Sequence, residues 1–206
     1  MNKTLNRIKN YFFIKRYPFY RIHNAWTGEE IGGYDTTWYD SIPEGWRKAF
    51  GKELSRNLRK ILKATGELET FQFIQIKQKW GSLRLYTGAI SQEAQEVLSY
   101  YEHLSIGYCM YCGKPARYCT EPYVAYVCED CFEKMVGQWC DKQSELEAQK
   151  KKFRLTTQDI PHFYRYYKND NDNYIEYEVP SGVDYETLWD LPYEEKLDDN
   201  HHITVD

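Results

Sequence analysis

The chain has 206 residues, of which 42% are hydrophobic, 17% aromatic and 28% charged, and its formal net charge is −4. This composition is that of a folded globular protein and excludes a disordered or collagenous chain. The net acidity argues against coating of nucleic acid by the whole chain, and no apolar run approaches the roughly 20 residues that a membrane span needs.

The first 20 residues show no secretion signal. Their apolar run, residues 11–14, is only four residues long and is followed by Lys15 and Arg16. A signal peptide needs about 7–15 apolar residues and a small-residue cleavage site. We therefore expect a cytoplasmic protein without a membrane partner, whose six cysteines meet a reducing environment in which disulfides do not persist.

Charge is distributed unevenly along the chain. Residues 1–65 hold 13 Lys/Arg and 6 Asp/Glu, a balance of +7, whereas residues 141–206 hold 8 and 16, a balance of −8. A basic front and an acidic back can neutralise each other in the fold or face different partners.

The N-terminal region is expected to mix helices and strands. Residues 17–43 are rich in aromatics, Gly and Thr, and predict loops and short strands. A basic amphipathic helix should begin at Pro43 and end before Gly66, because proline fits a first turn and glycine ends helices. Its apolar residues recur at helical spacing on one face: Trp46, Phe50, Leu54, Leu58, Ile61 and Leu62.

A β-hairpin and a second helix should follow. The β-rich runs 71–76 and 83–86 flank Trp80-Gly81, which is the expected turn. Ser91 is placed to cap the next helix, since serine accepts a hydrogen bond from a free N–H of the first turn.

The strongest motif is a pair of Cys-x-x-Cys units. Cys109 and Cys112 are followed, after 15 residues, by Cys128 and Cys131. Two intervening residues let both sulfurs of a pair reach one ion at about 2.3 Å, and two such pairs at this separation predict a structural, four-thiolate Zn²⁺ site. The second pair lies where a helix should begin, which is the arrangement of a treble-clef finger. Gly113 follows the first pair, where a tight knuckle favours a residue able to adopt positive φ.

Other roles for these cysteines are weaker. An iron–sulfur cluster remains open because four thiolates also suit iron. A redox pair is disfavoured because two pairs occur without a βαβ context, and catalytic zinc is disfavoured because four protein ligands leave no position for water. Cys119 and Cys140 fit small buried hydrophobes, although either could replace one ligand, Cys119 most readily.

The C-terminal part completes an α+β fold. One long helix is expected after Cys131, ending in the three lysines 150–152, and two aromatic strands at 163–167 and 174–179 should form a hairpin before an acidic tail. We predict three regions: an N-terminal α+β region over 1–106, a treble-clef-like zinc module with its helix over 107–152, and the hairpin with its tail over 153–206.

Two surfaces are candidates for binding. Cations on the hairpin and the basic helix could contact nucleic acid or another anion, although such faces are more often simply solvated: Lys77, Lys79, Arg84, Arg56 and Arg59. The tail combines aromatic area with carboxylates that suit a basic protein partner: Tyr185, Trp189, Asp190, Tyr193, Glu194 and Glu195.

These features favour a non-catalytic, zinc-stabilised binding protein with a protein partner. A nucleic-acid-binding zinc finger is the first alternative, but the metal site and its surroundings carry net negative charge, which disfavours phosphate contacts. A metal-dependent hydrolase or nuclease is the least favoured, because His162 is the only arguable catalytic histidine and nothing nearby completes a site.

Several segments form a distinctive set of motifs: Tyr17–Phe19, Asn24–Gly28, Ile42–Trp46 with Ala49–Gly51, Gln75–Tyr86, and Ser105 followed by Cys109–Gly113. Together they resemble a family of uncharacterised proteins from bacteriophages, prophages and bacteria, in which a Gln-Ile-Lys-x-Lys-[Phe/Trp]-Gly-x-Leu-Arg hairpin precedes a Cys-x-x-Cys-Gly knuckle. The resemblance covers about residues 17–131, and Gln78 stands where the family more often has an acid. It implies a mobile-element accessory factor that engages or inhibits a host protein in the host cytoplasm.

Overall fold

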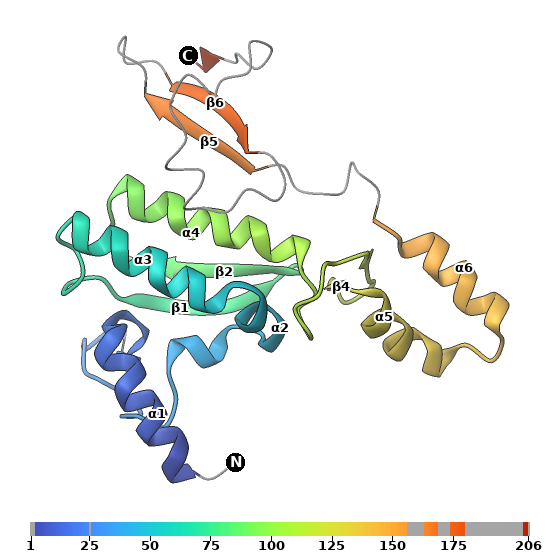
Figure 1. Cartoon of the computed structure of the whole chain (residues 1–206), viewed down its shortest axis with the longest axis horizontal. Coiled ribbons are helices and arrows are strands. Elements are labelled where there is room, and N and C mark those ends of the chain that lie inside the picture. Colours follow the sequence, from blue (N-terminus) through green and yellow to red (C-terminus); the bar gives the residue numbers. More distant parts are fainter. Residues whose placement is uncertain (1–2, 25, 156–162, 169–173, 180–203, 206) are drawn as a thin grey trace. The chain divides into compact units, whose positions relative to one another are not determined.

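A computed structural model describes residues 3–24, 26–155, 163–168, 174–179 and 204–205 of the chain (Figure 1). The chain divides into two compact units, residues 1–160 and 161–206. Helices and small antiparallel hairpins make up the described residues, so the predicted α+β class is confirmed. No helix within the described ranges is long and apolar enough to cross a membrane.

The chain starts with a helix that the sequence patterns did not predict, α1 (Lys3–Arg16). Its C-terminal half is held by a cluster of aromatic rings, in which Phe13 lies 4.8 Å from Tyr39 and 5.5 Å from Tyr20 between ring centroids. The helix ends at Arg16, shortly before Pro18, because proline and the residue before it disfavour continued helical geometry.

Within residues 17–43, the described residues 17–24 and 26–43 form short 3₁₀ helices and loops, so the expected short strands were wrong for most of this segment. The 3₁₀ helices are η1 (Pro18–Tyr20) and η2 (Trp38–Ser41), and the β-type pairing is a single bridge between His23 and Glu30. Aromatic packing explains the difference, because Phe19 and Tyr20 are fully buried in a cluster of rings. Their rings contact each other at a tilted angle, Tyr20 stacks on Phe73, and Phe19 meets Phe73 edge to face.

The predicted basic helix is confirmed as three consecutive segments, α2 (Glu44–Trp46), the π-helical turn η3 (Arg47–Gly51) and α3 (Lys52–Ala64). Five of the six predicted apolar residues are buried, and Ile61 is half-buried. The π turn lies where the helix passes Tyr39, whose hydroxyl oxygen would be 2.6 Å from a Cβ atom at Gly51.

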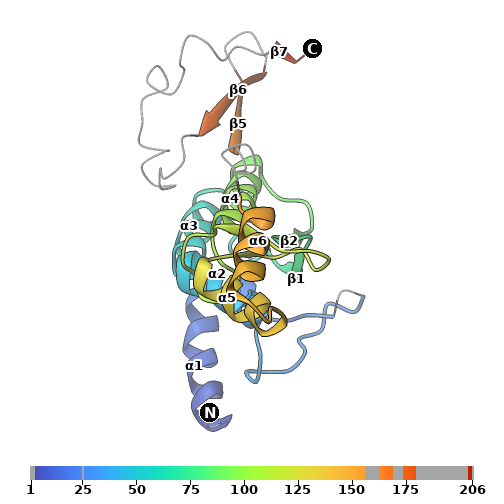
Figure 2. The same cartoon turned by 90° about the vertical axis from the view of Figure 1, so that its right-hand side faces the viewer.

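The predicted hairpin is also confirmed. Strands β1 (Phe73–Lys79) and β2 (Ser82–Thr87) pair antiparallel around the turn Trp80-Gly81, and both turn residues have positive φ, 53° and 77°. A two-residue turn with this backbone matches the right-handed twist of its strands. Ile76, Leu83 and Leu85 are buried, and α3 and α4 (Gln92–Leu104) run alongside the hairpin (Figures 1 and 2).

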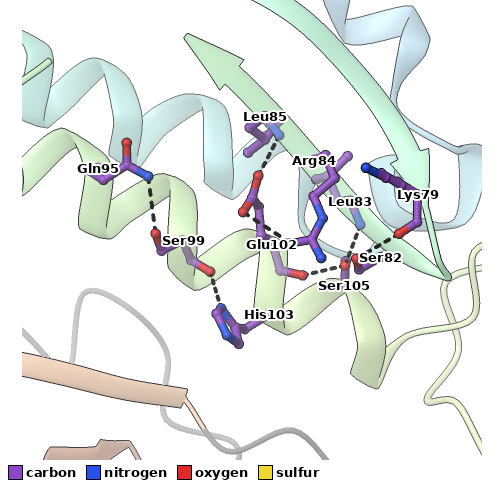
Figure 3. Close-up of polar contacts among 10 residues, drawn as sticks. All are labelled: Lys79, Ser82, Leu83, Arg84, Leu85, Gln95, Ser99, Glu102, His103 and Ser105. Atoms are coloured by element: carbon purple, nitrogen blue, oxygen red, sulfur yellow. Dashed lines mark hydrogen bonds and ion pairs between the residues drawn. The ribbon is translucent and has the colours of Figure 1, made fainter. Parts of the chain in front are cut away.

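Side chains of α4 and its C-cap satisfy the outer edge of β2 (Figure 3). The backbone N–H of Leu83 donates to Ser105 Oγ at 2.9 Å, and that of Leu85 donates to Glu102 Oε1 at 2.6 Å. An unpaired strand edge exposes donors that invite further strand pairing. Because residues 102 and 105 lie one helical turn apart, their spacing matches alternate N–H groups of the strand.

Replacing Ser105 by alanine should therefore destabilise the fold. Ser105 and Leu83 are fully buried, so the variant leaves a buried N–H without an acceptor, at a cost of about 1–3 kcal/mol. Urea denaturation measures this cost. Ser99→Ala in α4 is the control and should change stability by less than about 0.5 kcal/mol, because the Ser99 hydroxyl accepts an exposed hydrogen bond from Gln95. Equal effects of the two variants would contradict the role of Ser105.

The cysteine segment contains a small hairpin and two helices. The 3₁₀ turn η4 (Ser105–Gly107) leads to the paired strands β3 (Tyr118–Cys119) and β4 (Tyr126–Val127), and α5 (Glu129–Val136) follows. The expected single long helix after Cys131 is wrong. The chain turns through η5 (Gly137–Trp139) and an extended Cys140 before α6 (Gln143–Phe153) begins.

The break separates two helices that contact each other, and the residue expected on a buried face is not buried. Trp139, expected on the buried face of one helix, is 80% exposed in η5. Helix α6 instead folds back onto α5 through Lys150, whose ammonium group lies 2.5 Å from Glu133 and 3.1 Å from Glu129. These carboxylates raise the pKa of Lys150 above its usual value through the hydrogen bonds they accept.

In the second unit, β5 (Phe163–Lys168) and β6 (Tyr174–Val179) pair antiparallel, as the two aromatic runs predicted. A short strand that was not predicted, β7 (Thr204–Val205), pairs with β6. The acidic tail between β6 and β7 lies outside the described residues.

Candidate metal centre

The four cysteines of the two Cys-x-x-Cys units converge. The sulfur atoms of Cys109, Cys112, Cys128 and Cys131 all lie within 4.8 Å of one another, and those of Cys112 and Cys128 are 3.4 Å apart. Zinc–sulfur bonds of 2.3 Å in a tetrahedron place sulfurs about 3.8 Å apart, so the cluster has the size of a four-thiolate metal site. These four residues could therefore bind a metal ion.

A tight turn positions the first pair. The Cys109 N–H donates to the Lys114 carbonyl at 2.7 Å, and the Gly113 N–H donates back to the Cys109 carbonyl at 2.9 Å. Gly113 has a φ of 84°, as expected for the knuckle, and a Cβ atom there would lie 2.6 Å from the Gly45 carbonyl oxygen. Both its backbone conformation and its surroundings require glycine.

The start of a helix positions the second pair. Cys128 is the N-cap residue of α5, with extended backbone angles, and its carbonyl accepts the Phe132 N–H at 2.9 Å. Cys131 lies in the first turn of the same helix, where the partial positive charge of the helix N-terminus favours thiolates. Phe132 is fully buried and stacks on Tyr118 with ring centroids 4.4 Å apart, which fixes the helix against β3.

The knuckle is also attached to the basic helix. The Gly45 N–H donates to the Met110 carbonyl at 2.9 Å, and the Trp46 indole N–H donates to the Tyr108 carbonyl at 3.0 Å. The Met110 N–H reaches across to the Tyr126 carbonyl at 3.2 Å. Carbonyls flanking Cys109 thus anchor the start of the basic helix, and β4 accepts the Met110 N–H.

The thiols influence one another's protonation. Burial raises the pKa of Cys131 and of Cys128, and hydrogen bonds with neighbouring thiols contribute to the rise at Cys131. Burial also acts to raise the pKa of Cys112, but hydrogen bonds from the Lys114 backbone and the other thiols outweigh it and lower that pKa. Four adjacent thiolates repel each other, so a bound cation would stabilise the ionised cluster.

The remaining cysteines lie outside this group. Cys119 is in β3 and Cys140 follows η5, so neither belongs to the cluster that the described residues form. Four cysteine sulfurs fill a tetrahedral shell and leave no vertex for water or substrate. The arrangement suits a structural ion that ties the knuckle to a helix.

The candidate binding residues fall on different parts of the fold. Lys77 and Arg84 are cross-strand partners in the hairpin, and Lys79 is the strand residue next to the turn. Arg56 and Arg59 lie on α3, where the Arg59 side chain donates to the Arg16 carbonyl at 2.8 Å, at the end of α1. The six tail candidates and His162 lie outside the described residues.

Gly45 and Trp46 belong to the support of the metal centre, which the sequence patterns did not indicate. The available signal was a glycine early in an expected helix, where it weakens helix formation unless close packing requires it. A Cβ atom at Gly45 would overlap the Cys109 carbonyl oxygen and lie 2.6 Å from the Met110 carbonyl carbon.

No protein family, curated protein or solved structure matches this chain. The four clustered sulfurs and the backbone that holds them are the features that support a metal-binding site in this chain.

Proposed function

We propose that this protein is a zinc-stabilised, non-catalytic binding protein. The observation that carries the proposal is the convergence of four cysteine sulfurs from a knuckle and a helix start into one cluster. Zinc is the ion that best fits four thiolates in tetrahedral arrangement in a reducing compartment. An iron centre with four thiolates is the competing occupant.

The position of the cluster supports a structural role for the ion. The turn that carries Cys109 and Cys112 contacts the basic helix through Gly45 and Trp46. The loop between β3 and β4 contacts the β1–β2 hairpin through Val124, whose carbonyl accepts the Gln78 side-chain amide at 3.3 Å. The free energy of metal binding therefore adds to the stability of the N-terminal region as well as to that of the cysteine segment, residues 108–136.

For the partner, we propose a host protein that the acidic, aromatic segment 185–195 engages, with this chain acting as a phage or mobile-element accessory factor. The sequence of that segment supports the proposal, since Tyr and Trp supply contact area and carboxylates favour a basic surface. The resemblance to uncharacterised phage and prophage proteins also supports it.

One experiment tests both parts: the full chain is isolated from host cells and analysed for metal content and bound protein. We expect one zinc per chain, and a stoichiometric partner that the double variant Trp189→Ala/Tyr193→Ala loses while retaining its zinc. Protein without metal, or with iron, would overturn the zinc assignment. A loaded protein without a partner, or with one that the double variant keeps, would overturn the partner proposal.

A further inference from the structure

At the tip of the β1–β2 hairpin, Trp80 adopts a backbone conformation that is unfavourable for tryptophan. Trp80 has a φ of 53°, in the left-handed region, where a residue with a bulky side chain costs roughly 1–2 kcal/mol and where Asn or Gly is usual. Burial does not offset this cost, since Trp80 is 72% exposed. Folding alone therefore gives no reason for tryptophan at this position.

Contacts on one side support the tip. Gly81 packs so closely against β4 that a Cβ atom at Gly81 would lie 2.8 Å from the Tyr126 ring. The Gln78 amide donates to the Val124 carbonyl, and the Tyr123 hydroxyl donates to Gln78 Oε1, both at 3.3 Å. The exposed indole thus projects from a turn that is braced against the metal-binding segment.

The same hairpin carries a cationic surface. Neither strand contains a carboxylate. Lys77 faces Arg84 across the hairpin, and the Lys77 ammonium nitrogen lies 5.0 Å from the centroid of the half-exposed Tyr86 ring. Glu102 partly neutralises Arg84 at 3.6 Å (Figure 3), whereas no ion pair to Lys77 or Lys79 occurs within the described part of the chain.

We infer that Trp80 and the cations of this hairpin bind single-stranded nucleic acid, with the indole stacked on a base and Lys77, Lys79 and Arg84 beside the phosphates. The charge of the surface is complementary to a polyanion, and stacking of a base on an aromatic ring contributes about 1–3 kcal/mol. This gain is of the size of the backbone cost at Trp80. The inference goes beyond the proposed function and is independent of the protein partner, because it rests on residues 77–86.

The test measures binding of the zinc-loaded full chain to labelled oligo(dT) and oligo(rU) of roughly 12 nucleotides by fluorescence anisotropy. Trp80→Asn should weaken binding roughly tenfold, the effect of losing one stacked base, while its unfolding midpoint stays unchanged or rises because Asn-Gly suits the turn. Trp139→Asn is the matched control: Trp139 is also highly exposed but lies in η5, so its replacement should leave affinity unchanged.

The dependence on salt tests the cations. Three phosphate contacts predict a slope of log affinity against log salt of about −2, and Lys79→Gln should reduce that slope by about 0.7. No binding at low salt, equal affinities for the Trp80→Asn variant and the wild type, or a slope unchanged in Lys79→Gln would each overturn the inference. Equally strong competition by poly-glutamate would also overturn it, because the surface would then recognise acidic polymers in general.

Discussion

Cys112→Ser is expected to abolish metal binding at the cluster and to unfold the segment from Tyr108 to Val136. Serine offers a harder, less acidic oxygen in place of a thiolate, and the sulfur of Cys112 lies only 3.4 Å from that of Cys128 within the four-sulfur group. Structural zinc sites of this class contribute about 10–16 kcal/mol of apparent binding free energy, which is folding free energy for the residues that hold the ion. Metal content per chain and amide hydrogen exchange measure the two effects.

Cys140→Ser is the matched control. Cys140 is half-buried, like Cys112, but lies outside the sulfur cluster, so the variant should retain the full metal content and native exchange protection. Loss of metal in Cys140→Ser, or native protection of β4 and α5 in Cys112→Ser, would show that the four-sulfur group does not organise this part of the fold.

Gly45→Ala is expected to destabilise the protein by about 3 kcal/mol or more, at the upper end of the cost of overpacking. On helix propensity alone the substitution should stabilise by roughly 0.5–1 kcal/mol, but here the added methyl group would overlap the carbonyl of Cys109 and crowd that of Met110. Backbone atoms cannot move aside as a flexible side chain can, so the knuckle itself must shift. Denaturant unfolding and a zinc competition titration should both report the change.

The control for Gly45→Ala is Gly137→Ala. Gly137 has helical backbone angles, with φ of −59°, and a Cβ atom there would have no neighbour within 4 Å. This variant should change stability by less than about 1 kcal/mol and leave zinc affinity as it is. Equal changes in stability and zinc affinity for Gly45→Ala and Gly137→Ala would show that close packing of Gly45 against the turn carrying Cys109 is not important for either property.

These two predictions test the same contact, the one between the start of the basic helix and the turn that carries Cys109 and Cys112. The cysteine variant removes a ligand and tests whether the segment from Tyr108 to Val136 then unfolds. The glycine variant leaves all four cysteines in place but displaces the turn that carries two of them. Weakened zinc affinity in Gly45→Ala would show that the N-terminal helix and the metal centre stabilise each other.

The main elements could be predicted because their signals are local. The apolar spacing from Trp46 to Leu62 specifies one face of a helix, Trp80-Gly81 between two β-rich runs specifies a hairpin, and the two Cys-x-x-Cys units specify a cluster of four ligands. Each signal depends on residues within a few positions of one another, or on a donor chemistry that few other arrangements can satisfy.

Elements whose stability comes from distant contacts could not be predicted in this way. Helix α1 has few capping signals and is held by rings from residues far along the chain, such as Tyr39. In place of the single helix expected after Cys131, α6 lies against α5 with Lys150 paired to carboxylates of α5, a contact that no local pattern indicates. In both places tertiary contacts outweigh helical periodicity, which is a weak guide where packing is absent.

The sequence by itself determined the α+β class, the basic helix, the hairpin with its turn and which four cysteines form the cluster that could bind a metal ion. Only the tertiary structure decided that Ser105 and Glu102 cap the edge of β2, that Gly45 packs directly against the turn carrying Cys109, and that Gly81 packs on the Tyr126 ring. The physical reason is the distance along the sequence between the residues involved. Helical periodicity and ligand spacing relate residues a few positions apart, whereas backbone packing at Gly45 and capping of the β2 edge join residues that only burial of the core brings together.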